Sequence, residues 1–167
     1  MAVETFERFL NPADRAKAVV ELSEKGDEAV SLLLSLFEGT AKNDFGSPYK
    51  DIGASECGFE VALRLGPRAK PLERHLRDGS RARYPTAVAA LGNLERLDQL
   101  SVDTLVEAVR SGHAIVQGEA AAALLKQGLG EHPCLAELER SSDFWPSFLT
   151  RLRAQYAPHH ALRPNFR

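Results

Sequence analysis

Apolar side chains recur every three or four residues along most of the chain, the spacing that indicates amphipathic helices. Near the N-terminus this pattern predicts two helices, one from Pro12 to Gly26 and one from Asp27 to Gly39. Asn11 is a predicted N-cap, because its side chain accepts hydrogen bonds from the free N–H groups of a first turn. Proline is tolerated in that turn, and glycine adopts the left-handed conformation that commonly ends a helix. The sequence therefore predicts a pair of helices joined by a tight turn.

The same pattern returns further along the chain. A helix ends at Gly66, and the next one, opened by Pro67, ends at Gly79. Forty positions separate Gly26 from Gly66, and the same number separates Gly39 from Gly79. A period of this size is typical of helix-pair repeats. Apolar positions also correspond in this frame: Ala29 with Ala69, Leu32 with Leu72, and Leu36 with Leu76.

Two further helix pairs follow with less regular boundaries. The third runs from the apolar segment 87–91 to a helix that Ser101 caps and Gly112 ends, with no tight Gly-Pro turn between them. The fourth joins the alanine-rich segment 120–125, ended by Gly128, to a short helix around Leu135 and Leu138. A last helix, capped by Ser142 or Asp143, is expected to cover the open end of the array with the apolar residues Phe144, Phe148, Leu149 and Leu152.

The segment Leu65-Gly-Pro-Arg-Ala-Lys-Pro-Leu72 resembles the inter-helix turn of bacterial HEAT-like repeats, whose pattern is G-P-x-A-x-P-L. The resemblance covers roughly residues 12–140 and implies an all-α fold, a short right-handed α-solenoid of HEAT-like antiparallel helix pairs. We expect one domain over residues 1–157 and a C-terminal tail, residues 158–167, outside it. Two prolines and the lack of an apolar stripe favour a loose tail. Such solenoids serve many binding roles, so the resemblance alone assigns no function.

Composition narrows the class of protein. The 167 residues suit a single domain, and the net charge of −2 argues against binding nucleic acid with the whole surface. The N-terminus has no basic and apolar leader, and the run Leu32–Leu34 is too short to span a bilayer. We therefore expect a cytoplasmic protein that does not contact membranes. Cys57 and Cys134 are two free thiols of a reducing compartment or, alternatively, one disulfide bridge.

The residue types needed for catalysis or metal binding do not occur together in any recognisable pattern. Cys57 has no histidine at helical spacing, and the pair His132 and Cys134 lacks a second pair of zinc ligands. His159 and His160 lie in the predicted tail. The glycines end helices and do not form a phosphate-binding loop. We therefore expect no enzyme activity, no cofactor and no metal.

Charged residues are grouped along the sequence. Acidic residues outnumber basic ones in 1–38 and 95–139, whereas basic residues outnumber acidic ones in 68–83 and from 151 onward. Bands of alternating sign along a solenoid would favour one register of a charged protein partner. An ordinary solvated surface is the other interpretation.

The segment from Gly39 to Asp51 is longer than helix pairs of this kind need. Connections of about 12 residues or more in compact domains are mostly functional or disordered. This one contains Phe45 and Tyr49, aromatic residues that disordered segments usually lack. Two interpretations remain open: the aromatic side chains are displayed as a recognition surface, or they fold back and plug the groove between repeats.

The leading functional hypothesis is a protein-binding module, specifically a small bacterial immunity or adaptor protein. As an immunity protein it would cover the active site of a cognate toxin. Short HEAT-like proteins resemble such antidotes, and this resemblance implies a protein partner. We expect Phe45, Tyr49, Arg77, Arg81 and Tyr84 to dominate binding, because a few anchors usually do. The predicted partner-binding residues are Asn43, Asp44, Phe45, Tyr49, Lys50, Asp51, Arg74, Arg77, Arg81, Arg83 and Tyr84.

The alternative hypothesis is nucleic-acid binding, as in HEAT-like DNA-repair glycosylases. Arg74, Arg77, Arg81 and Arg83 would then form a track for phosphate groups. The acidic flanking segments disfavour this alternative, because they would repel a duplex. A bilin lyase or scaffold, a third class suggested by other HEAT-like proteins, lacks a suitable ligand cysteine.

Overall fold

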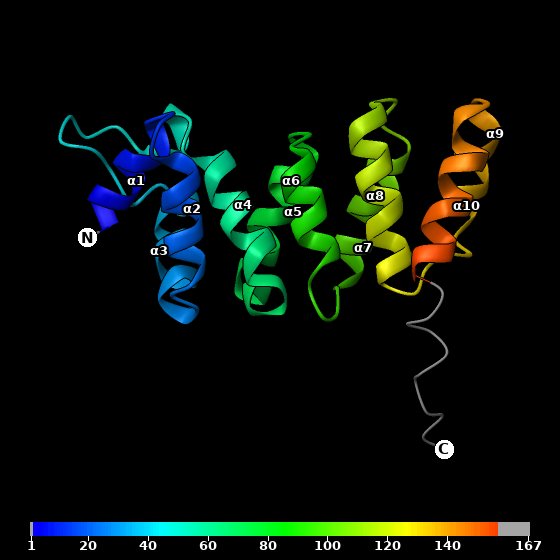
Figure 1. Ribbon diagram of the computed structural model, residues 1–167, viewed down its shortest axis with the longest axis horizontal. Helices are drawn as coiled ribbons and strands as arrows, with labels where there is room; N and C mark the ends of the chain where they lie inside the picture. Colours follow the sequence, from blue (N-terminus) through cyan, green and yellow to red (C-terminus); the bar gives the residue numbers. More distant parts are fainter. Residues whose placement is uncertain (1, 157–167) are drawn as a thin grey trace, which may run out of the picture.

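The computed structural model describes residues 2–156, which are α-helical apart from the 40–48 segment, shorter turns and two 3-10 helices (Figure 1). Within these residues Lys42 and Pro48 form an isolated β-bridge, and no β-strand is present. The all-α prediction is therefore confirmed. The α-helices are α1 (Ala2–Leu10), α2 (Arg15–Ser23), α3 (Asp27–Glu38), α4 (Ser55–Leu65), α5 (Glu73–Arg81), α6 (Pro85–Gly92), α7 (Gln99–Val109), α8 (Ala114–Lys126), α9 (Pro133–Ser141) and α10 (Phe144–Tyr156), and the 3-10 helices are η1 (Tyr49–Ile52) and η2 (Gly66–Leu72).

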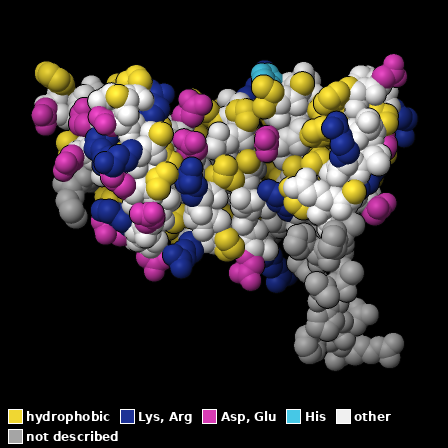
Figure 2. All heavy atoms as spheres, viewed as in Figure 1, with side chains coloured by type: hydrophobic (Ala, Val, Ile, Leu, Met, Phe, Trp, Pro, Cys, Tyr) yellow, Lys and Arg dark blue, Asp and Glu magenta, His cyan; other side chains and the backbone are white. Residues whose placement is uncertain are grey.

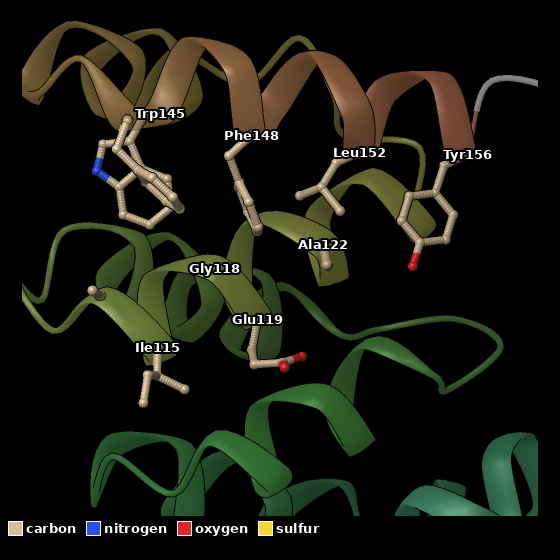
Figure 3. A pocket seen from close by; sticks show the side chains of 10 residues that line it. Ile115, Gly118, Glu119, Ala122, Trp145, Phe148, Leu152 and Tyr156 are labelled. Atoms are coloured by element: carbon tan, nitrogen blue, oxygen red, sulfur yellow. The ribbon is translucent and has the colours of Figure 1, made fainter.

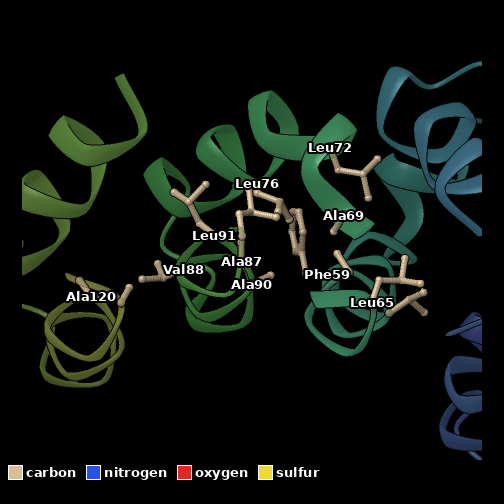
Figure 4. Packing of buried hydrophobic residues seen from close by; sticks show 14 of the residues in the cluster. Phe59, Leu65, Ala69, Leu72, Leu76, Ala87, Val88, Ala90, Leu91 and Ala120 are labelled. Carbon is tan, nitrogen blue, oxygen red and sulfur yellow. The ribbon is translucent and has the colours of Figure 1, made fainter. Parts of the chain in front are cut away.

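The helices lie in chain order along the long axis of the molecule (Figure 1). Alternate helices contact one another: α2 packs on α4, α4 on α6, α6 on α8 and α8 on α10. A second set is formed by η2 with α5, then α7 and α9. One cluster of buried apolar side chains extends from Phe6 to Leu149 between the two sets. Figure 4 shows its central part, where Phe59, Leu76 and Leu91 meet.

The forty-residue spacing is visible in the backbone. Gly26 has φ 59° and ψ −117°, and Gly66 has φ 57° and ψ −128°. Both glycines lie where two paired helices join, and this conformation is accessible mainly to glycine. Leu36 and Leu76, which correspond in the same frame, are both fully buried. The repeat predicted from the sequence is therefore present at these positions.

The second pair of corresponding glycines behaves differently. Gly39 ends α3 in a left-handed conformation, as predicted, but Gly79 lies inside α5. A Cβ on Gly79 would lie 2.5 Å from Cζ of Phe59 and 2.8 Å from Cβ of Ala87. The prediction that Gly79 ends a helix is wrong. A glycine stands there because α4 and α6 approach α5 closely.

Several helix starts also differ from the prediction. Helix α2 begins at Arg15, because the Asn11 side chain accepts a hydrogen bond from the Ala13 N–H at 3.0 Å and forms a separate turn. The N-cap of α7 is Asp98, whose carboxylate accepts from the Ser101 N–H at 2.7 Å. Ser101 is therefore not the cap. Helix α1 was not predicted, although its Phe6 belongs to the core.

Cys57 and Cys134 are buried free thiols, so the disulfide alternative is not adopted. Across residues 2–156, each helix is too short or too polar to cross a membrane. The predicted tail, residues 158–167, lies outside the described residues.

The contact between α6 and α8 generates a testable prediction. A Cβ on Gly92 would lie 2.5 Å from Cβ and 2.7 Å from Cα of Ala123, so Gly92→Ala must separate the two helices. We expect it to lower the free energy of unfolding by about 1–3 kcal/mol.

Gly118→Ala is the control. Its new Cβ would lie 3.4 Å from the Phe148 ring, an ordinary contact, and the higher helix propensity of alanine would stabilise the protein by up to about 1 kcal/mol. Urea denaturation measures both; equal stability of the two variants would contradict the close α6–α8 approach.

Candidate partner-binding surface

The connection between α3 and α4 is a hydrogen-bonded loop. The Asn43 side chain accepts from the N–H groups of Phe45 at 3.0 Å and Ser47 at 2.9 Å. Backbone bonds close the same turn, from the Asn43 N–H to the Ser47 carbonyl and from the Gly46 N–H to the Asn43 carbonyl. The backbone around Phe45 is therefore held from both sides.

Tyr49 anchors this loop to the core. Its side chain is fully buried, its ring centroid lies 5.5 Å from that of Phe6, and its hydroxyl donates to Oε1 of Glu7 at 2.7 Å. Burial and the hydrogen bond to Glu7 raise the pKa of Tyr49 to about 12. Tyr49 is thus the packed plug that the sequence left as one alternative. Its predicted place among displayed binding residues is wrong, because α1 covers it.

Phe45 has the opposite environment. Its side chain is 92% exposed, and the loop projects from the N-terminal end of the row (Figure 1). Asp44, Lys50 and Asp51 are also exposed, while Asn43 is half-buried by its role in the turn. The loop therefore buries one of its two aromatic side chains, Tyr49, and exposes the other, Phe45.

Arg77 is engaged within the protein. Its Nη1 lies 2.7 Å from Oδ2 of Asp98 and 3.3 Å from the Ser101 hydroxyl, and its side chain is 13% exposed. Burial opposes ionisation of Asp98, but hydrogen bonds from Ser101 and Arg77 hold its pKa below the ordinary value. Arg77 therefore ties α5 to the start of α7, and little of its side chain is left for a partner, contrary to its predicted place among the anchors.

The other predicted residues lie on or next to α5. Arg74, Arg81, Arg83 and Tyr84 are exposed. Arg81 and Arg83 border a shallow hollow of about 200 Å³ together with Glu107. Helix α5 lies in the middle of the row, whereas the loop between α3 and α4 lies at its N-terminal end (Figure 1). The predicted binding residues therefore fall on two separate surfaces.

Ion pairs form within the predicted acidic bands and leave their net charge unchanged. Arg8 pairs with Glu21 at 2.6 Å, and Arg110 pairs with Glu137 at 2.8 Å. On the face that Figure 2 shows, acidic and basic side chains are intermixed over the N-terminal half of the row. This surface resembles ordinary solvated helices more than blocks of one charge.

Sequence reasoning missed a row of rings along the middle of the molecule. Phe37 and Phe59 stack at 4.9 Å, His75 lies 5.6 Å from Phe37, and Tyr84 lies 5.3 Å from Phe59. Burial lowers the pKa of His75. The rings come from α3, α4, α5 and the residue before α6, so no spacing within one helix could reveal them.

The described part of the chain contains no group of three His, Cys, Asp or Glu side chains that could hold a metal ion. No protein-family model matches the chain, and neither curated proteins nor solved structures give a significant match. The functional interpretation therefore depends on the geometry of these residues.

The contrast between the two loop aromatics is testable through stability. Tyr49→Ala removes a buried ring, and we expect it to lower the free energy of unfolding by about 3–5 kcal/mol. Phe45→Ala removes an exposed ring, so its effect should stay within about 0.5 kcal/mol. Urea denaturation followed by circular dichroism measures both values. Similar losses in the two variants would show that Phe45 also packs against the protein.

The raised pKa of Tyr49 predicts a pH dependence. The neutral hydroxyl is favoured in the folded state, so its stabilising contribution is complete below the ordinary tyrosine pKa of about 10 and is lost as the pH rises toward 12. Tyr49→Phe cannot ionise. We expect it to be about 1 kcal/mol less stable than the wild type near neutral pH, and this difference should shrink between pH 10 and 12. A difference that stays constant over this interval would contradict the buried contact with Glu7.

Proposed function

We propose that this protein is a protein-binding module and that Phe45 is a principal anchor for its partner. The observation that carries the proposal is a 92% exposed aromatic side chain at the tip of a hydrogen-bonded loop. Leaving such a ring in water forgoes the free energy of burying it. A partner that covers the ring recovers this free energy.

The loop is also suited to binding because it is already ordered. Asn43 fixes the backbone on both sides of Phe45, and Tyr49 fastens the loop to α1. A partner therefore meets a preformed anchor, and little conformational entropy is lost when the complex forms. Aromatic side chains presented in this way are common among residues that dominate interfaces.

The proposed architecture is a short right-handed α-solenoid of HEAT-like antiparallel helix pairs. It is supported by the packing of alternate helices and by the shared conformation of Gly26 and Gly66, forty residues apart. Arrays of this kind offer long surfaces relative to their size, which suits partner binding.

The finer proposal is a bacterial immunity protein that covers the active site of a cognate toxin. It rests on the binding-module proposal, because a projecting ring on a hydrogen-bonded loop suits the covering of a partner's surface. Under this proposal Phe45 would enter a concave part of the toxin, since a projecting ring needs a pocket to be buried.

The nucleic-acid alternative has less support. Arg77 is paired with Asp98, and Glu107 borders the hollow that Arg81 and Arg83 line. A carboxylate beside two arginines weakens their attraction for phosphate groups.

Affinity capture with three baits tests the proposal: the wild type, Phe45→Ala, and the control Leu100→Ala. Leu100 is another exposed apolar residue, on α7. We expect one protein, identified by mass spectrometry, to be retained by the wild type and the control. Its affinity for Phe45→Ala should fall at least about tenfold.

Equal retention by Phe45→Ala would reject Phe45 as an anchor. Recovery of nucleic acid that depends on Arg81 and Arg83 would favour the alternative. For the immunity proposal, the captured protein should be toxic when expressed alone, and co-expression of the wild type, but not of Phe45→Ala, should suppress this toxicity.

A further inference from the structure

A groove of about 470 Å³ lies between α8 and α10 (Figure 3). These two helices are at the opposite end of the row from the loop between α3 and α4 (Figure 1). One wall is formed by large residues of α10, among them Phe148, Leu152 and Tyr156. The floor is formed by small residues of α8: Ala114, Gly118 and Ala122. The groove is open to solvent along its length, and apolar side chains gather over it (Figure 2).

The sequence explains why the groove is not filled. Ala114, Gly118 and Ala122 recur every four residues and therefore lie along one side of α8. Phe144, Phe148, Leu152 and Tyr156 recur at the same interval along one side of α10. The small residues on α8 leave space that the rings of α10 only partly occupy.

The rim of the groove exposes apolar side chains. Ile115 is 63% exposed and Phe144 is 57% exposed, from opposite walls. Phe144 and Phe148 stack at 5.4 Å, and Trp145 meets Phe148 edge-on at 5.5 Å. The exposed Phe144 ring is thus packed against two other rings of α10, those of Trp145 and Phe148.

Glu119 gives the groove a negatively charged side chain. It lines the groove from α8 as an acidic residue among apolar ones, and Figure 3 shows its carboxylate extending on the side of Tyr156. The ion pairs formed among residues 2–156 do not include Glu119. An arginine or lysine placed in the groove by a partner would complement this carboxylate.

We propose that the groove binds one amphipathic helix of a partner protein, with apolar residues on one face and a basic residue beside them for Glu119. Helix α10 supplies a wall of 13 residues, which at about 1.5 Å per residue accommodates roughly three turns of a bound helix. The small floor residues allow its backbone to approach α8 closely. A helix satisfies its own backbone hydrogen bonds, whereas an extended strand would find no free backbone partners between two helices.

This surface is separate from the Phe45 loop and differs from it in kind. Phe45 projects and enters a partner, while the groove receives one. The two proposals can therefore fail independently.

A charge-swap titration tests the proposal with the full chain. The probes are two synthetic helical peptides with the same leucine stripe, one carrying arginine and the other glutamate at the position beside the stripe. Fluorescence of Trp145, the single tryptophan of the chain, reports binding because its ring lines the groove. We expect the arginine peptide to bind about fivefold more tightly than the glutamate peptide.

Glu119→Arg should reverse this preference. Glu24→Arg, which makes the same charge change on an exposed residue of the N-terminal half, should leave it unchanged. Replacing the leucine stripe with serine should abolish binding. Absence of a Trp145 response, or a preference that Glu119→Arg does not reverse, would overturn the proposal.

Two other occupants are distinguishable. If the wild type sediments as a dimer that Phe144→Ser dissociates, a second copy covers the groove and the partner helix is rejected. If peptides bind only after Leu162→Ser and Phe166→Ser, the chain's own C-terminal residues occupy the groove, which also overturns the proposal.

Discussion

The row of helices depends on how closely neighbouring helices can approach. Where α6 crosses α8, Gly92 meets the backbone of Ala123, and where α5 meets α4 and α6, Gly79 accepts Phe59 and Ala87. Any side chain at these glycines would enlarge the spacing and open voids in a core that must be close-packed. Because each helix contacts only nearby helices, these few contacts set the position of everything beyond them, including the loop at one end and the groove at the other.

The parts of the fold that the sequence predicts are those controlled by local chemistry. The turns at Gly26, Gly39 and Gly66 follow from the backbone freedom of glycine, and helix type follows from apolar spacing. The parts it misses depend on contacts between distant residues. Gly79 looks like a helix end until Phe59 lies against it, and Tyr49 looks as available as Phe45 until α1 covers it. The groove was missed for the same reason, because the small residues of α8 form a groove only where α10 faces them.

The two proposed binding surfaces would each arise by a different change to the helical row. At one end the chain inserts extra residues between helices and presents a ring. At the other end, α8 carries small side chains where it faces α10, and a groove lies between the two helices. The loop contributes Tyr49 to the core and leaves Phe45 exposed, whereas the groove is formed by helices that keep their place in the row.

The hydrogen bond between Tyr49 and Glu7 links the loop to the first helix of the chain. Detachment of α1 would uncover Tyr49 and remove one support of the loop that carries Phe45, although Phe45 is far from α1 in sequence. Under the proposed function, a partner that captures Phe45 would therefore also favour the docked position of α1. A modification near the N-terminus would act on binding at a distance, through occupancy of the docked state.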